Sequence, residues 1–99
     1  MKHIYTVYHC TDLRAMSNPV LGKRLWTDHR DHYRKVAEVE APSLDEVFRL
    51  TNHITGNWQD NADVKALVDG PVRSTSVGDV LVQGEDAWLV EPFGFTAMA

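Results

Sequence analysis

The segment RSTSVGDVLVQ, residues 73–83, combines a flexible turn with the start of a regular strand. Gly78 can adopt a positive φ without steric cost, and the side chain of Asp79 can hydrogen-bond to its own backbone two residues on. A run of three apolar, largely β-branched residues follows at 80–82, as half-buried strands prefer. This pattern predicts a strand over 79–83 that is launched by the turn before it.

The second half of a hairpin follows directly. Residues 84–86 read Gly-Glu-Asp, a short turn that contains glycine, and a second apolar run begins after them. Two apolar runs separated by such a turn predict a β-hairpin, here with strands over 79–83 and 87–92. Pro92 cannot donate a ladder hydrogen bond, so we expect it to end the second strand. The rings of Phe93 and Phe95 are both expected in the core.

The turn over Ser74–Asp79 has two interpretations. It could face a ligand, because it is rich in hydroxyl groups and carries a carboxylate. It could equally be a structural turn, because Gly, Asp and Ser are the residues that ordinary turns require. We favour the structural interpretation.

Two further strands are predicted in the N-terminal half, over 2–9 and 33–41. The first alternates regularly between residues 3 and 9 and is rich in aromatic and β-branched side chains. The second carries valine and alanine between charged residues. An antiparallel pairing of the two is the natural arrangement. The region between them has no clean period and is expected to be a mostly exposed loop over 23–32.

A helix is predicted from Leu44 to Thr55. Ser43 and Glu46 have the spacing of a capping box, in which each side chain bonds to the backbone of the other residue. Apolar residues then recur at helical spacing and form a stripe that should face the core. Gly56 supplies a C-terminal stop.

The sequence therefore predicts a single α+β domain over residues 1–99. Its small antiparallel sheet combines two N-terminal strands with a C-terminal hairpin, and one main helix packs on one face. The single cysteine, Cys10, cannot form an intrachain disulfide, which fits a reducing compartment. No signal peptide or membrane-length apolar run is present, so we expect a soluble, cytoplasmic protein without membrane contact.

The net charge of −4 conceals two halves of opposite sign. Residues 1–35 contain seven Lys or Arg and three acids, whereas residues 36–99 contain three Lys or Arg and eleven acids. Such a division can steer a charged partner, or the halves can satisfy each other within the fold or across a dimer. We favour mutual satisfaction.

A basic and aromatic segment over 23–35 supports a nucleic-acid alternative. Its cations could contact phosphates, and its aromatic rings could stack on bases. Against this, the pI of about 5.6 is low for a nucleic-acid-binding domain. The candidate residues are Lys23, Arg24, Trp26, Arg30, Arg34 and Lys35, with Tyr33 as a second stacking ring.

Other candidate sites are weaker. His29 and His32 are three residues apart, and a metal-dependent hydrolase could use them or His53. A structural zinc site, however, needs four ligands. We therefore expect no metal and no cofactor. His9 and Cys10 are neighbours, yet on a strand they point to opposite faces, and no catalytic set is assembled. A possible pocket would be lined by Asn52, His53, Trp58 and Asp60, although a core or rim position for Trp58 and a helix-end position for His53 are favoured.

The C-terminal half carries a resemblance. The run Arg73-Ser74-Thr75-Ser76-Val77-Gly78-Asp79-Val80, followed by a hairpin and Phe93-Gly94-Phe95, resembles the C-terminal signature of YodL-like accessory domains. It is also similar to small uncharacterised proteins of actinobacteriophages and related mobile elements, over roughly residues 36–97. The resemblance implies an α+β fold and a phage or mobile-element setting, and it names no catalytic residues.

We therefore expect a non-enzymatic protein-interaction module of phage or mobile-element origin, which binds and modulates a host or phage protein in the host cytoplasm. The alternative is a nucleic-acid-binding protein that uses residues 23–35. An exposed edge strand and an aromatic loop also favour self-association as a homodimer.

Overall fold

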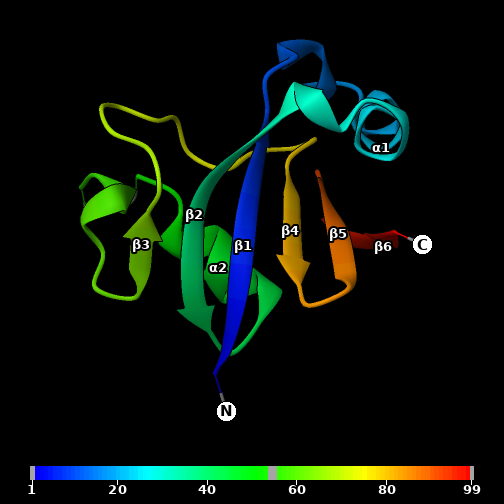
Figure 1. The fold of residues 1–99 in the computed structure, drawn as a ribbon. Helices are drawn as coiled ribbons and strands as arrows, with labels where there is room; N and C mark the ends of the chain where they lie inside the picture. Colours follow the sequence, from blue (N-terminus) through cyan, green and yellow to red (C-terminus); the bar gives the residue numbers. More distant parts are fainter. Residues whose placement is uncertain (1, 54–55, 99) are drawn as a thin grey trace.

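The computed structural model describes residues 2–53 and 56–98, and its centre is a six-stranded antiparallel sheet (Figure 1). The strand order across the sheet is β3-β2-β1-β4-β5-β6. Two helices and three short 3₁₀ turns complete the α+β fold that the sequence predicts. In chain order the elements are β1 (His3–Cys10), η1 (Leu13–Met16), α1 (Pro19–Asp28), η2 (Arg30–His32), β2 (Tyr33–Ala41), α2 (Leu44–Leu50), η3 (Trp58–Asp60), β3 (Val64–Ala66), β4 (Val80–Gln83), β5 (Asp86–Glu91) and β6 (Gly94–Met98).

The four predicted strands are confirmed, with shifts of one or two residues at their ends. β1 pairs with β2 antiparallel, from His3 opposite Ala41 to Cys10 opposite Tyr33. β4 and β5 form the predicted hairpin, and Gly84 opens its two-residue turn with a φ of +59°. A positive φ at this position matches the right-handed twist of the flanking strands, which explains the glycine.

Two strands extend this sheet at its edges. β3 pairs antiparallel with the Ala37–Val39 part of β2. β6 pairs with β5 after a tight turn through Pro92 and Phe93. The expectation that both phenylalanine rings lie in the core is wrong for Phe93, which is 99% exposed, and correct for Phe95, which packs on the core beside Phe48.

The sheet has a core on each face. α2 lies behind the sheet in Figure 1 and covers a cluster that includes Val7, Val47 and Leu81. On the opposite face, α1 covers the end of the sheet near Cys10 with Leu25 and Trp26. Alternation along β1 and β4 places neighbouring residues in different clusters, so one strand supplies both layers.

The expected loop over 23–32 is wrong, because most of it belongs to helix α1. Asn18 caps this helix through a hydrogen bond from the Leu21 N–H, and Pro19 occupies the first turn, where it costs no hydrogen bond. The buried side of α1 is short, with Gly22, Leu25 and Trp26, which explains the weak periodicity of the segment.

Helix α2 is shorter than predicted and ends at Leu50. Ser43 caps it as expected, because its side chain accepts from the Glu46 N–H. The other half of the expected capping box is wrong, because the Glu46 carboxylate accepts from Arg49. At the other end, Thr51 Oγ1 donates to the carbonyl of Val47, and the Thr51 carbonyl accepts from the Thr75 N–H. The Thr51 side chain and a distant loop thus supply hydrogen bonds to backbone carbonyls at this end of the helix. The last two residues of the predicted helix, 54 and 55, lie outside the described part of the chain.

Candidate functional site

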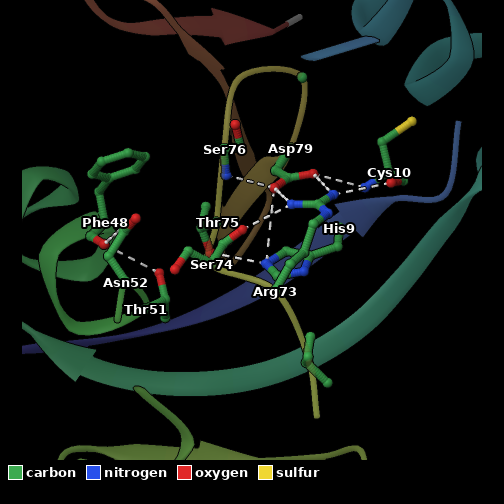
Figure 2. A network of polar contacts seen from close by, with 12 residues as sticks. His9, Cys10, Phe48, Thr51, Asn52, Arg73, Ser74, Thr75, Ser76 and Asp79 are labelled. Atoms are coloured by element: carbon green, nitrogen blue, oxygen red, sulfur yellow. Dashed lines mark hydrogen bonds and ion pairs between the residues drawn. The ribbon is translucent and has the colours of Figure 1, made fainter. Parts of the chain in front are cut away.

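The segment over 73–79 is held by an ion pair between Arg73 and Asp79 (Figure 2). Arg73 Nη1 lies 2.7 Å from Asp79 Oδ2, and Arg73 Nη2 lies 2.8 Å from Asp79 Oδ1. This two-pronged geometry is the strongest form of the Arg–carboxylate pair. The hydrogen bonds to Asp79 raise the pKa of Arg73 above its ordinary value. The guanidinium is therefore charged at neutral pH.

The same carboxylate fixes two backbone segments. Asp79 Oδ1 accepts from the Cys10 N–H at 2.8 Å, and Oδ2 accepts from the Ser76 N–H at 2.7 Å. Arg73 donates to the carbonyls of Cys10 and Ser74. The expectation that Asp79 bonds to its own backbone two residues on is wrong, because the side chain is fully buried against the end of β1. Its hydrogen bonds join the turn to the N-terminal strand across 69 residues of sequence.

A buried histidine completes the cluster. His9 Nε2 lies 2.9 Å from Thr75 Oγ1 and 3.8 Å from Asp79 Oδ2. Burial lowers the pKa of His9 from 6.5 to about 4, although the nearby Asp79 raises it. The imidazole is therefore neutral at pH 7, and its approach to Asp79 is not an ion pair at that pH. We call His9, Arg73, Thr75 and Asp79 the buried polar network.

Two aromatic residues anchor the same loop from either side. The Tyr33 hydroxyl donates to the carbonyls of Gly22 and Gly78, and burial raises its pKa. The fully buried Trp58 donates its indole N–H to the carbonyls of Val72 and Arg73. The loop is thereby held between the two cores of the sheet.

The chemistry of the buried polar network is structural. Its histidine, threonine and carboxylate are each less than 5% exposed, and all four side chains have hydrogen-bond partners. Within residues 2–53 and 56–98, every buried side-chain nitrogen or oxygen has a partner. Asp79 faces strand β1 and the loop itself. The geometry supports the structural interpretation of the Ser74–Asp79 turn.

His9 and Cys10 occupy opposite faces of β1, as predicted. The His9 ring lies 6.2 Å from the Trp58 ring, whereas Cys10 is buried in the cluster under α1. Their side chains therefore cannot act on one substrate atom as a nucleophile and its base.

The candidate nucleic-acid residues divide into exposed cations and a buried ring. Trp26 is 7% exposed and packs edge-on against Tyr8 and Tyr33, and the Arg30 guanidinium lies 3.7 Å from the centre of its ring. Neither Trp26 nor the buried Tyr33 is open to a stacking base. The side chains of Lys23, Arg24, Arg34 and Lys35 are exposed.

The structure does not gather the candidate pocket residues around one opening. Trp58 lies in the core, and its backbone N–H donates to Nδ1 of the exposed His53. Asn52 donates to the Phe48 carbonyl at the end of α2, and Asp60 is exposed in η3. Of the core and rim positions expected for Trp58, the structure shows the core.

The close histidine pair lies at the surface. The rings of His29 and His32 are 6.1 Å apart and edge-on to each other. In the part of the chain that the structure describes, no group of three His, Cys, Asp or Glu side chains is placed to hold one metal ion.

Strand β6, which forms one edge of the sheet, is the element near this site that the sequence did not predict. Val90 bonds through its N–H and its C=O to residues 78–79, on the β4 side of the sheet. Val90 therefore has no backbone group left to bond to β6, where Phe95 lies opposite it. In an antiparallel ladder such a pair exchanges no hydrogen bonds, so the N–H and C=O of Phe95 point away from β5. Ala97, two residues on, does the same. Among the described residues, no strand pairs with this outer side.

A groove adjoins the same edge on the α2 side. It has a volume of about 200 Å³ and is lined by Phe48, Phe95 and Pro92, with Asp45 and Glu91 among its other residues. The edge and the groove together could accept an extended segment, because the edge offers backbone groups and the groove offers apolar surface.

Comparison with known proteins gives no relative: no family model, no curated protein and no solved structure matches this chain. In the described part of the chain, no helix has the length and apolar character needed to cross a membrane.

Proposed function

We propose that this chain is a non-enzymatic protein-interaction module that binds an extended segment of its partner as an added strand on β6. The observation that carries the proposal is the unprotected edge. β6 reads Gly-Phe-Thr-Ala-Met, and it contains no charge and no proline. Natural proteins protect sheet edges with charged residues and proline, because an open edge pairs with other chains. Strand addition uses these unpaired groups for affinity.

An exposed aromatic residue adjoins this edge. Phe93 is 99% exposed in the turn between β5 and β6. A large ring in full contact with water costs solvation free energy that burial against a partner recovers. Aromatic side chains of this kind anchor many interfaces.

The phage or mobile-element setting is part of this proposal. It rests on the resemblance of the sequence pattern in the C-terminal half to small proteins of actinobacteriophages and mobile elements, and it makes a host protein the expected partner. The buried polar network supports a non-enzymatic role, because its groups bind one another.

The test is a capture experiment from an actinobacterial lysate with three baits: the wild type, Ala97→Pro and Ala97→Val. Proline removes the outward N–H of Ala97 but leaves the β5–β6 ladder intact, whereas valine keeps the N–H. We expect a protein that the wild type and Ala97→Val capture and Ala97→Pro does not. Capture of the same proteins by all three folded baits would contradict the proposal.

A second candidate function is nucleic-acid binding at the α1 end. The observation that favours it is that, among the described residues, Lys23, Arg24, Arg34 and Lys35 form no ion pair and are exposed. We expect binding to short DNA or RNA that weakens steeply with salt and is lost when all four residues become Ala. Arg30 is left unchanged, because it covers Trp26. Unchanged binding by the fourfold variant would contradict this function.

A further inference from the structure

We infer that the segment accepted by β6 is a strand that carries apolar residues on its α2 side and basic residues toward both of its ends, and that it belongs to a different protein, not to a second copy of this chain. This inference rests on the proposed function and adds the chemistry of the partner. It is carried by the side chains that surround the open edge.

The apolar half of this chemistry comes from the groove beside β6. The rings of Phe48 and Phe95 are half-buried, with centroids 6.4 Å apart. They line the α2 side of the edge together with the exposed Pro92. An added strand places every second side chain on this side, so those positions bury apolar groups against the two rings.

The basic half comes from carboxylates at both ends of β6. Asp45 and Glu91 adjoin the end at Gly94, because both line the groove there. Glu85 and Asp86 adjoin the other end, since Asp86 precedes the residue paired with Met98. Within residues 2–53 and 56–98 these four acids form no ion pair.

This arrangement selects against a second copy. Symmetric antiparallel pairing of two β6 strands would set the Gly94 end of one copy against the Met98 end of the other. Each end would then bring its carboxylates toward those of the partner copy, and like charges across an interface disfavour association. A strand with Lys or Arg meets opposite charge at both ends.

The test compares two synthetic peptides, (Lys-Val)₄ and (Glu-Val)₄, each labelled with a fluorophore and titrated with the full chain at low salt. We expect the lysine peptide to bind at least about tenfold more tightly than the glutamate peptide. The double variant Asp45→Asn/Glu91→Gln should lose most of this preference. A matched control, Glu38→Gln/Glu40→Gln, removes the same charge on β2 and should keep it.

Ala97→Pro separates edge pairing from general attraction between a cation and an acidic protein. It retains every charge, so loss of the lysine-peptide binding in this folded variant would place the peptide on β6. Equal binding of the two peptides, or no binding of either, would overturn the inferred chemistry. The proposed function would still stand if lysate capture depends on the Ala97 N–H. If the wild type forms a dimer that Ala97→Pro abolishes, the inference that the partner is a different protein would be overturned.

Discussion

At the scale of single residues, Asp79 has the largest structural role. Its carboxylate accepts four hydrogen bonds, two from Arg73 and one each from the backbone of Cys10 and Ser76. A fully buried charge is tolerated only when it is paired and hydrogen-bonded in this way. The turn therefore depends on a contact with the N-terminal strand.

Replacement of Asp79 by Asn should destabilise the fold by about 2–4 kcal/mol, because it leaves the Arg73 guanidinium without its counter-charge. Urea unfolding at pH 7 measures this loss. Asp86→Asn is the control, since that carboxylate is exposed. A change below about 1 kcal/mol for Asp79→Asn would contradict the assigned role of the pair.

His9 makes stability depend on pH. Its pKa falls from 6.5 to about 4 on folding, so the unfolded chain binds the proton more tightly. The contribution of His9 is fully present above pH 6.5 and is lost progressively as the pH falls toward 4, by about 3 kcal/mol in total.

The measurement is the free energy of unfolding of the wild type and His9→Gln between pH 4 and pH 7. Subtraction of the two curves removes the contributions of the carboxylates. We expect the free energy of unfolding of the wild type to fall relative to that of His9→Gln as the pH falls. Parallel curves would show that His9 keeps its ordinary pKa in the folded protein.

At the scale of elements, the sheet and its turns depend on glycines in different ways. Gly78 has a φ of +90°, and a Cβ built on it would lie 2.7 Å from the Ala15 carbonyl oxygen. Gly84 has a φ of +59° and no atom within 4 Å of such a Cβ. The first glycine is required for close approach of the turn to η1, whereas the second serves only backbone conformation.

Alanine at these two positions separates the two effects. Gly84→Ala should cost about 1 kcal/mol, since it forces an ordinary residue into the left-handed region. Gly78→Ala should cost at least about 3 kcal/mol, because the same strain is joined by a clash with backbone that must move. Thermal or urea unfolding measures both, and equal losses would contradict the close contact with Ala15.

At the scale of the whole molecule, two cores share one sheet. Val47 packs in the cluster under α2, and Leu25 packs in the cluster under α1 on the opposite face. The charge halves are joined less than expected: among the described residues, Lys2 with Asp63 is the one Lys or Arg pair that links residues 1–35 to residues 36–99. Within the fold, ion pairing between the two halves is therefore limited to this pair, and mutual satisfaction across a dimer stays a prediction.

Cavities in the two cores should act independently. Val47→Ala and Leu25→Ala should each destabilise the protein, by about 2 and about 3 kcal/mol. The double variant should lose the sum within about 0.5 kcal/mol, because the two side chains belong to separate clusters on opposite faces of the sheet. Denaturant unfolding of the four proteins measures the coupling. A coupling above about 1 kcal/mol would show that the two faces are not separate cores.

The sequence by itself determined the elements whose signals are local. Strands β1, β2, β4 and β5 alternate in their own residues, and Ser43 caps α2 through a bond three residues away. These features depend on φ and ψ preferences and on period, which any short window contains. The α+β class follows from them.

The tertiary structure alone decided what depends on distant partners. Just beyond the end of α2, the Thr51 carbonyl accepts from the Thr75 N–H, and the buried carboxylate of Asp79 accepts from the N–H of Cys10. The open edge of β6 exists only because the sheet ends there, and no window of sequence reports which strand is last. Hydrogen bonds across the sheet join residues that the chain separates by many positions, so their energy becomes visible only after folding brings them together.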